Sequence, residues 1–372
     1  MIILSAGLSK RMGAFKPLLP VGGQPAILRD IQTASEAGVY EIIVVTGHLR
    51  EQLETTLSAG AQRARLVYNN HYRSDMLTSV RAGVSELPAN TDGFFLLPAD
   101  CCAVRADTLI SIVDRFTRNG GESVAHPVYN GYRGHPPLIP ARYADRILSD
   151  SRKDGLKEIL VQLPSEGVEV NDPCILLDMD TPEDYAALLD SLDLKPYPEP
   201  VQSMELLNKY GTPADIIEHG RQVARLALKI AQLIADRAVA EPGNSKINMP
   251  LLESACLLHD IRRMDPDHAR SGMELLLREG YPKAAMIVGS HTDLPVPALD
   301  TGETELLYLA DKLSRHGDNV TLDETIRELE SKFSQDQEAF ANAERRIKTA
   351  MMIMDSLASR YDIGYKDIFS GE

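Results

Sequence analysis

A run of prolines divides this sequence into two halves with different patterns. Three prolines fall within Lys195-Pro196-Tyr197-Pro198-Glu199-Pro200. Because proline has no backbone N–H and a fixed φ, we expect neither a helix nor a paired strand in this segment. Before it, short apolar runs alternate with helical periodicity, and beyond it only the helical periodicity continues. We therefore predict domains at residues 1–194 and 204–372, joined by a proline-rich linker at residues 195–203.

The first half has the pattern of an α/β fold. Apolar runs that alternate with helical segments are typical of a mostly parallel sheet. The expected strands are Ile2–Leu4, Glu41–Thr46, Arg65–Tyr68, Gly93–Pro98 and Ser123–Val128, with a late strand at Cys174–Met179. The expected helices are Pro25–Ala37, Leu49–Ala59, Ser79–Glu86, Asp107–Phe116 and Pro182–Asp190.

The second half is predicted to be all-α. Its helical segments are Ile216–Ala235, Pro250–His259, His268–Glu279, Lys283–Ser290, Glu303–Leu313 and Asp323–Leu357. The stretch Ser334-Gln335-Asp336 favours a break in the last of these, because serine and aspartate compete with the helix backbone for hydrogen bonds.

Charge and composition exclude several classes of partner. The formal net charge is −15, so the overall field repels nucleic acid and anionic membrane surfaces. The four cysteines show no C-x-x-C spacing, which argues against a zinc knuckle and indicates reduced thiols. The start of the chain lacks the pattern of a signal peptide, and no apolar stretch is long enough to span a membrane. We expect a cytoplasmic protein that binds neither nucleic acid nor membrane.

A glycine-rich loop follows the first expected strand. Gly7 and Gly13 would let backbone N–H groups approach phosphate oxygens without a Cβ in the way, and Arg11 and Lys16 add positive charge. An ordinary strand-to-helix loop also uses glycine, but clustered cations favour an anion. The candidate nucleotide-binding residues are Leu4, Ser5, Ala6, Gly7, Ser9, Arg11, Gly13 and Lys16.

This loop carries a family resemblance. The run from Leu4 to Lys16, together with Leu18-Leu19-Pro20-Val21, resembles the signature of the MobA-like nucleotidyltransferases, which include molybdenum cofactor cytidylyltransferases and guanylyltransferases. The resemblance implies a Rossmann-like three-layer domain in which Arg11 and Lys16 contact the phosphates of an NTP. It implies transfer of the nucleotidyl group to a phosphorylated acceptor such as molybdopterin, with release of pyrophosphate and a molybdoenzyme as partner. Alanine before Gly7 resembles the family members that use CTP, so the resemblance implies CTP in preference to GTP.

Two carboxylates are candidates for Mg²⁺. Asp100 ends an apolar run, and an aspartate at the carboxyl end of a parallel strand faces the ligand crevice. The segment Asp178-Met179-Asp180-Thr181-Pro182-Glu183-Asp184 resembles a family element whose aspartate binds metal, which implies Asp180 in preference to Asp178. Each could instead serve a helix N-terminus. The segment Gly131–Leu138 resembles the acceptor side of the family's site.

Two alternatives to this function stay open. The acceptor could be a sugar phosphate or an alditol phosphate on the same fold. The chain could also be a molybdopterin cofactor chaperone with little turnover. Pyrophosphate release would separate an enzyme from a carrier.

A second candidate site lies in the helical half. His219 falls on the apolar stripe of its helix, the doublet His259-Asp260 ends an apolar run, and Asp311 follows Leu309-Ala310. One histidine in a core is usually just hydrogen-bonded, but a buried carboxylate without a partner is costly, so Asp260 and Asp311 require a cation. Histidine and aspartate together suit a transition metal that activates water.

These residues resemble the HD phosphohydrolase superfamily. The resemblance implies a metal held by His219, His259, Asp260 and Asp311, with Asp260 also catalytic, and a second metal position at His268 and His291. The ion would be Mn²⁺, Fe²⁺ or Zn²⁺. Where the family often has lysine after the doublet, this chain has Arg262-Arg263-Met264, so Arg263 is either a phosphate clamp or one of a solvated surface pair. Together the two resemblances predict a bifunctional enzyme.

Overall fold

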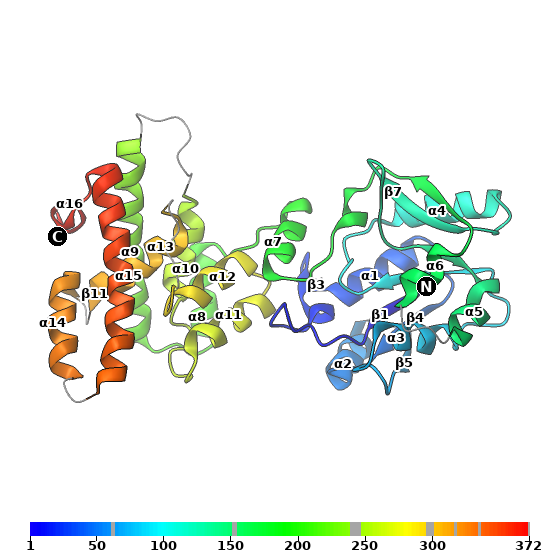
Figure 1. Ribbon diagram of the computed structural model, residues 1–372, viewed down its shortest axis with the longest axis horizontal. Helices are drawn as coiled ribbons and strands as arrows, with labels where there is room; N and C mark the ends of the chain where they lie inside the picture. The colour runs from blue at the N-terminus through cyan, green and yellow to red at the C-terminus, as the bar shows by residue number, and fades with distance from the viewer. Residues whose placement is uncertain are drawn as a thin grey trace. The chain divides into compact units, whose positions relative to one another are not determined.

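In the computed structural model, two units make up the chain, Met1–Leu194 and Lys195–Glu372. The structure describes residues 1–60, 64–150, 155–238, 247–294, 301–315, 318–333 and 336–370. Figure 1 shows the sheet and its helices in the first unit and the helices of the second.

Eight of the described strands form one mixed, mostly parallel sheet in the first unit. The strand order is β10-β7-β9-β6-β1-β4-β5, and β8 pairs with β7. All pairs are parallel except β6 with β9, β7 with β9 and β7 with β8. The bounds are β1 Ile2–Ser5, β4 Ile42–Thr46, β5 Ala64–Tyr68, β6 Gly93–Pro98, β7 Val124–Tyr129, β8 Tyr132–Arg133, β9 Leu138–Pro140 and β10 Ser165–Glu169, with β2 Pro20–Val21 and β3 Gln24–Pro25 in a separate hairpin.

Helices cover both faces of this sheet, which gives three layers. Side chains of a strand alternate between the faces, so Ile3 packs with α1, α2 and α4 while Ile2 packs with α3, α5 and α6. The helices are α1 Ala26–Glu36, α2 Arg50–Gly60, α3 Met76–Val84, α4 Ala106–Arg118, α5 Ala144–Ser149, α6 Gly155–Val161 and α7 Pro182–Ser191, with 3₁₀ turns at Lys16–Leu18, Ala141–Tyr143 and Pro173–Leu176. The predicted three-layer α/β class is confirmed.

Two predicted elements of this unit differ in the structure. The late strand predicted at Cys174–Met179 is wrong, because Pro173 begins a 3₁₀ turn in which the N–H of Cys174 donates to the carboxylate of Asp172. The third helix starts at Met76 and not at Ser79, because Asp75 caps it through the N–H of Leu77.

The second unit is built from helices, as predicted. They are α8 Pro200–Lys209, α9 Ala214–Arg237, α10 Met249–Leu258, α11 His268–Arg278, α12 Pro282–Ser290, α13 Glu303–Leu313, α14 Leu322–Lys332, α15 Gln337–Tyr361 and α16 Tyr365–Phe369. The predicted last helix is divided into α14 and α15, although residues 334–335 of the expected break lie outside the described residues. The sequence pattern missed α8, α16 and the short hairpin of β11 Ser314–Arg315 and β12 Asp318–Asn319.

The proline-rich segment is bonded to the second unit. Pro200 is the first residue of α8, where a missing N–H costs nothing, so the last four residues of the expected linker are helical. Before Pro200, the carbonyl oxygen of Pro196 accepts a bond from the N–H of Lys283 at 3.0 Å, and that of Pro198 accepts one from the hydroxyl of Ser254 at 2.5 Å.

We propose that the two units fold independently. A chain cut between Leu194 and Lys195 should give two soluble fragments with cooperative thermal unfolding, because each unit has its own core. A cut within residues 196–199 should destabilise the second fragment, since it removes the bonds to Lys283 and Ser254. Circular dichroism melting of both pairs checks this, and a molten second fragment after the first cut would contradict it.

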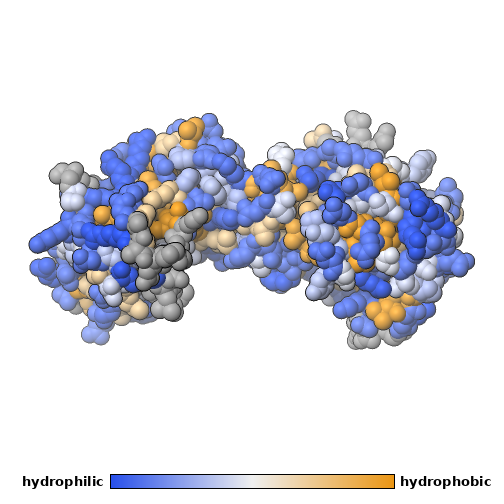
Figure 2. Space-filling view, turned by 90° about the horizontal axis from the view of Figure 1, so that it is seen from above, coloured by the Kyte–Doolittle hydropathy of each residue, from blue (hydrophilic) through white to orange (hydrophobic). Residues whose placement is uncertain are grey.

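Hydrophilic residues predominate on the molecular face that Figure 2 shows, with smaller hydrophobic patches between them. All four cysteines are free and buried. Among the described residues, no helix has the length and apolar character needed to cross a membrane.

Candidate functional sites

Two neighbouring strands bring the glycine-rich loop and Asp100 to the same edge of the sheet. β1 and β6 are parallel, with Leu4 opposite Pro98, and the N–H of Ala99 donates to the carbonyl oxygen of Leu4 at 3.1 Å. The carboxyl ends of parallel strands meet at one edge, where ligands bind in open α/β sheets. The loop after Ser5 and the carboxylate of Asp100 therefore face one site.

The loop is shaped by backbone with positive φ. Ser9 has φ 50° and Gly13 has φ 74°. The hydroxyl of Ser9 accepts a hydrogen bond from the N–H of Lys16 at 3.1 Å, which closes the loop. A Cβ at Gly7 would meet no described atom within 4 Å, so the space in front of its backbone is open. This is the room that a phosphate group needs to approach main-chain N–H groups.

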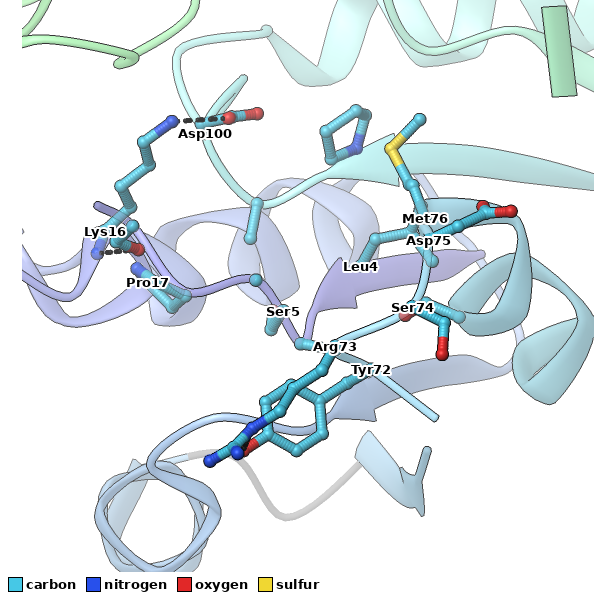
Figure 3. Close-up of a pocket in the computed structure, with 16 residues that line it drawn as sticks. Leu4, Ser5, Lys16, Pro17, Tyr72, Arg73, Ser74, Asp75, Met76 and Asp100 are labelled. Carbon is cyan, nitrogen blue, oxygen red and sulfur yellow. Dashed lines mark hydrogen bonds and ion pairs between the residues drawn. The ribbon is translucent and has the colours of Figure 1, made fainter. Parts of the chain in front are cut away.

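Lys16 lies between the two predicted metal carboxylates. Its ammonium nitrogen Nζ is 3.0 Å from Oδ2 of Asp100 and 2.6 Å from Oδ1 of Asp180. Arg11 reaches the other oxygen of Asp180, at 2.7 Å. Figure 3 shows Lys16 and Asp100 pointing toward one another. The two carboxylates, which are 80 positions apart in sequence (180 − 100), thus converge on one cation.

The charges of this group shift its titration. The hydrogen bond from Lys16 lowers the pKa of Asp180, and Arg11 lowers it further. Burial lowers the pKa of Lys16, but its bonds with Asp180 and Asp100 outweigh burial, so the pKa is raised. Burial, followed by the charges of Asp180 and Asp100, raises the pKa of Asp178. Lys16 is therefore a cation, and Asp180 a carboxylate, at neutral pH.

Neither Asp100 nor Asp180 caps a helix. The N-cap of α4 is Arg105, and that of α7 is Thr181, which forms a capping box with Asp184. The helix start at Pro182 that the sequence indicated is present, but the capping residue is Thr181 and not Asp180. This leaves both carboxylates for a cation, and their oxygens are the ligands that Mg²⁺ prefers.

A cavity of about 270 Å³ is lined by Lys16 and Asp100, whereas Asp180 is not among its lining residues. Of the predicted nucleotide-binding residues, Arg11 and Gly13 are not among those that line it; the lining includes Leu4, Ser5, Ala6, Gly7, Ser9 and Lys16, with Asp100. Sequence reasoning missed another wall of the cavity, residues Tyr72 to Met76, which lead into α3 and are labelled in Figure 3. The side-chain amide of Asn69 braces this segment by donating to Thr78 and Ser79. The sequence signal for the segment Tyr72 to Met76 was a run of polar residues after the parallel strand β5.

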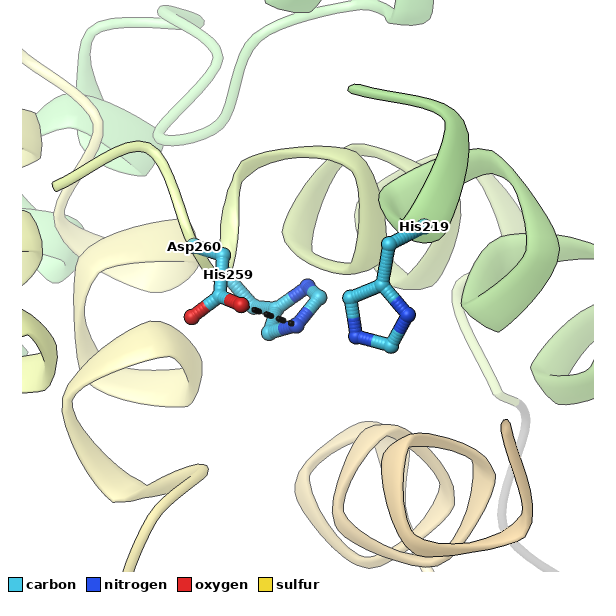
Figure 4. A group of neighbouring side chains, drawn as sticks. All are labelled: His219, His259 and Asp260. Atoms are coloured by element: carbon cyan, nitrogen blue, oxygen red, sulfur yellow. Dashed lines mark ion pairs between the residues drawn. The ribbon is translucent and has the colours of Figure 1, made fainter. Parts of the chain in front are cut away.

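Five helices bring the six predicted ligands of the second site together. His219 comes from α9, His259 and Asp260 follow α10, His268 begins α11, His291 follows α12 and Asp311 lies on α13. Nε2 of His259 is 3.5 Å from both Oδ2 of Asp260 and Oδ1 of Asp311. Oδ1 of Asp311 is 3.2 Å from Nε2 of His219. Figure 4 shows His219, His259 and Asp260 converging.

On its other side, Asp260 faces two more imidazoles. Its Oδ1 is 3.4 Å from Nε2 of His268 and 3.5 Å from Nε2 of His291. Ligand atoms bound at about 2.1 Å to one ion lie roughly 3.0–3.4 Å apart, so these separations resemble coordination shells. In the part of the chain that the structure describes, two groups could hold an ion, His219 with His259 and Asp260, and Asp260 with His268 and His291. Asp260 belongs to both.

Backbone carbonyls set the tautomers of the two most buried histidines. His259 and His291 are the C-cap residues of α10 and α12, and their Nδ1 atoms lie 2.8 and 2.6 Å from the carbonyl oxygens of Cys256 and Val288. A carbonyl only accepts, so Nδ1 carries the hydrogen and neutral Nε2 has a lone pair for a metal. The negative ends of both helix dipoles favour a cation there.

Glycines allow the helices to approach closely enough for this. A Cβ at Gly220, next to His219, would lie 2.9 Å from the carbonyl oxygen of Leu257 on α10. A Cβ at Gly289 would lie 2.8 Å from the sulfur of Met273 on α11. A larger residue at Gly220 would therefore push α9 away from the backbone of α10, and one at Gly289 would displace the side chain of Met273.

The donor set fits a metal. Among the described residues, no hydrogen-bond partner reaches Nε2 of His259, Oδ1 of Asp260 or Nε2 of His291, although all three atoms are buried. Buried polar atoms without partners are costly, and one or two cations would satisfy them together. Burial would raise the pKa of Asp260, but interaction with His291, His259 and Arg263 outweighs it and holds the pKa below its usual range.

Two cations flank this cluster. Nη1 of Arg263 lies 3.6 Å from Oδ1 of Asp260 and 3.2 Å from Nε2 of His268. The ammonium group of Lys312 contacts Oδ2 of Asp311 at 2.5 Å. Arg263 thus points toward the ligand cluster, whereas Arg262 pairs with Asp265. The two adjacent arginines have different surroundings.

Comparison with known proteins bears on both halves. The sequence profile of the MobA-like NTP transferase domain matches residues 1–167, and that of the HD domain matches residues 216–316. The molybdenum cofactor cytidylyltransferase of Escherichia coli K12 is 30% identical over 184 residues, which cover 50% of this chain and 92% of that protein. The chain belongs to the MobA-like NTP transferases. Its second half contains an HD domain.

More distant relatives of the MobA-like domain are also similar over the first half. The bifunctional protein GlmU of Caldanaerobacter subterraneus is 27% identical over 161 residues, which cover 42% of this chain and 34% of that protein. The crystal structure of a nucleotidyl transferase from Methanothermobacter is 24% identical, with a TM-score of 0.45, and the match covers 51% of this chain and 95% of that one.

The MobA-like domain has a second cavity, of about 400 Å³, beside the first. Leu4, Met76 and Pro98 line both cavities. The segment Gly131–Leu138 contributes Arg133 and His135 to it. Gly134 fixes this segment, because a Cβ there would lie 2.2 Å from the carbonyl oxygen of Ile175.

Proposed function

We propose that the MobA-like domain transfers CMP from CTP to a phosphorylated acceptor, with molybdopterin the favoured one. A phosphate oxygen of the acceptor attacks the α-phosphorus of CTP, a new P–O bond forms, and pyrophosphate leaves with the electrons of the broken bond. The observation that carries the proposal is that Asp100 and Asp180 both contact the ammonium group of Lys16, which belongs to the glycine-rich loop. The 30% identity to a cytidylyltransferase supports CTP.

In this proposal some residues of the chain bind the phosphates of the nucleotide, and others hold the metal ion. Backbone N–H groups around Gly7 would donate hydrogen bonds to the phosphate oxygens, and Arg11 and Lys16 would form ion pairs with them. Asp100 and Asp180 hold Mg²⁺, which when bound supplies charge that stabilises the phosphates during transfer. No side-chain nucleophile is needed, because positioning and electrostatics lower the barrier.

The second cavity supports an acceptor with both a ring and a phosphate. Its lining is mostly apolar, from Leu96, Leu156 and Leu160, and includes the cations Arg133 and Lys157. Burial lowers the pKa of His126 to about 4, so this imidazole is neutral at pH 7 and can hydrogen-bond a heterocycle. A sugar phosphate acceptor remains the alternative, to which the likeness to GlmU gives support.

We further propose that the HD domain is a metal-dependent phosphohydrolase for a nucleotide or phosphate ester. His219, His259, Asp260 and Asp311 would hold one ion, and Asp260 with His268 and His291 a second. Mn²⁺, Fe²⁺ or Zn²⁺ fits this mixed nitrogen and oxygen set and lowers the pKa of a bound water. Arg263 is placed to pair with a phosphate near Asp260, which favours the clamp over a solvated surface role.

A screen of pyrophosphate release tests the transferase proposal. The full chain is incubated with Mg²⁺, each of the four NTPs, and molybdopterin or a set of sugar and alditol phosphates. We expect release with CTP and molybdopterin. Release only with a sugar phosphate would move the acceptor to the alternative class, and stoichiometric binding of molybdopterin without release would identify a chaperone.

Arg11→Ala should lower kcat/KM for the NTP by roughly tenfold, because one charged contact to phosphate is lost at an exposed position. The matched control is Arg118→Ala, since Arg118 is an exposed arginine on α4 that pairs with Asp114. Steady-state kinetics of both variants measures the effect. Equal kcat/KM in the two variants would remove Arg11 from the phosphate site.

A further inference from the structure

The position of Lys16 has a consequence for how the transferase site is loaded. We propose that Lys16 blocks the metal position of the free protein, so that divalent metal binds this site only with a nucleotide that draws Lys16 onto its phosphates. This inference rests on the proposed transferase function. It concerns the order of binding, which neither the fold nor the reaction requires.

The carboxylate oxygens of Asp100 and Asp180 are largely occupied by cations of the chain itself. The side chain of Lys16 is only 12% exposed, and its ammonium nitrogen lies within hydrogen-bond distance of one oxygen of each aspartate. Arg11 takes the remaining oxygen of Asp180. Three of the four oxygens that could ligate an ion are thus already paired with cations of the chain.

The ammonium group of Lys16 and a metal ion cannot both occupy the position between Asp100 and Asp180. Mg²⁺ binds oxygens at about 2.0–2.1 Å and requires near-ideal octahedral geometry. An ion that bound Asp100 and Asp180 together would lie in the space that Nζ of Lys16 now holds, and the two positive charges would repel strongly at this range. Metal binding therefore requires Lys16 to leave.

The phosphates of a bound nucleotide would provide a new position for the ammonium group of Lys16. The backbone N–H of Lys16 is bonded to Ser9 in the glycine-rich loop, and Lys16 lines the cavity, so a rotation of its side chain alone would bring the ammonium group to the proposed phosphate position. Phosphate oxygens in the cavity would give the ammonium new partners, and the metal would replace it between the aspartates. Nucleotide and metal then raise each other's affinity, because coupling between two ligands is reciprocal.

The experiment measures Mn²⁺ binding to the full chain by the electron paramagnetic resonance signal of free Mn²⁺. The variants are the parent, Lys16→Met, which keeps the length of the side chain without its charge, and Lys10→Met, which removes an exposed cation of the same loop. The HD domain contributes equally to all three. Each protein is titrated alone and with α,β-methylene CTP, whose own Mn²⁺ binding is subtracted.

Without nucleotide, Lys16→Met should bind Mn²⁺ at this site on the order of tenfold more tightly than the parent, because a competing charged hydrogen bond is lost. At Mn²⁺ concentrations that leave the site empty in the parent, the variant therefore binds one ion more. Lys10→Met should behave as the parent, and the parent should gain this Mn²⁺ only with the analogue. If the parent binds the extra Mn²⁺ alone, or if Lys16→Met gains none while the analogue still binds, the inference fails and the transferase function stands. If no variant binds the analogue, both fail.

Discussion

Asp100→Asn is expected to lower the turnover of nucleotidyl transfer by about 10²–10³-fold while the thermal unfolding of the protein stays near that of the parent. The substitution removes the negative charge of one metal-binding carboxylate and no core volume, since Asp100 lies just after β6 with its side chain 24% exposed. Lys16 also loses one of its two anionic partners. The measurement is steady-state pyrophosphate release at saturating Mg²⁺.

The control for this variant is Asp107→Asn. Asp107 lies in the first turn of the adjacent helix α4 and is largely exposed, so it changes the net charge equally. We expect turnover near the parental value. Near-parental turnover in Asp100→Asn as well would mean that the transferase does not use this carboxylate.

The double variant His259→Ala/Asp260→Ala should lose the metal of the HD domain and its phosphohydrolase activity, and keep nucleotidyl transfer. These neighbours supply a nitrogen and an oxygen from one helix end, and Asp260 belongs to both candidate ion groups. The remaining histidines and Asp311 would hold an ion with too few donors. Elemental analysis of the purified protein gives the result directly.

Two further variants separate metal loss from unfolding. Asp260→Asn preserves the volume of the side chain and should still release most of the metal, because the amide is a poorer ligand than a carboxylate. Asp265→Asn, whose carboxylate pairs with Arg262 and not with the cluster, should retain it. Metal at the parental level in the double variant would show that His259 and Asp260 only pack and cap.

Local patterns predicted much of the fold. The strand Gly93–Pro98 and the helix Glu303–Leu313 have the predicted bounds, because their apolar runs are long and bounded by clear signals. The short apolar run at Cys174–Met179 misled, since a run of this length does not distinguish a strand from a turn. Pro173, which cannot donate to a ladder, was the better guide there.

For the sites, the residue patterns alone predicted the donors, whereas their convergence was implied only by the family resemblances. Asp100 was predictable because it ends a buried strand, whereas its approach to Asp180 depends on tertiary contacts such as the bond from Met179 N–H to the carbonyl oxygen of Asp100. The wall from Tyr72 to Met76 was missed because a polar run after a strand, even with Arg73 and Asp75, is also typical of an ordinary surface loop. The proximity of His219 to His259 depends on packing at Gly220, which no local pattern reveals.

The most direct test of the account is anomalous X-ray scattering from crystals of the full chain grown with Mn²⁺ and α,β-methylene CTP. We predict one Mn²⁺ peak between Asp100 and Asp180 with the nucleotide over the Gly7 loop. We also predict Mn²⁺ at one or both of the histidine groups that share Asp260. Nucleotide bound without a peak between the two aspartates, or a histidine cluster without Mn²⁺, would contradict two metal-dependent sites in one chain.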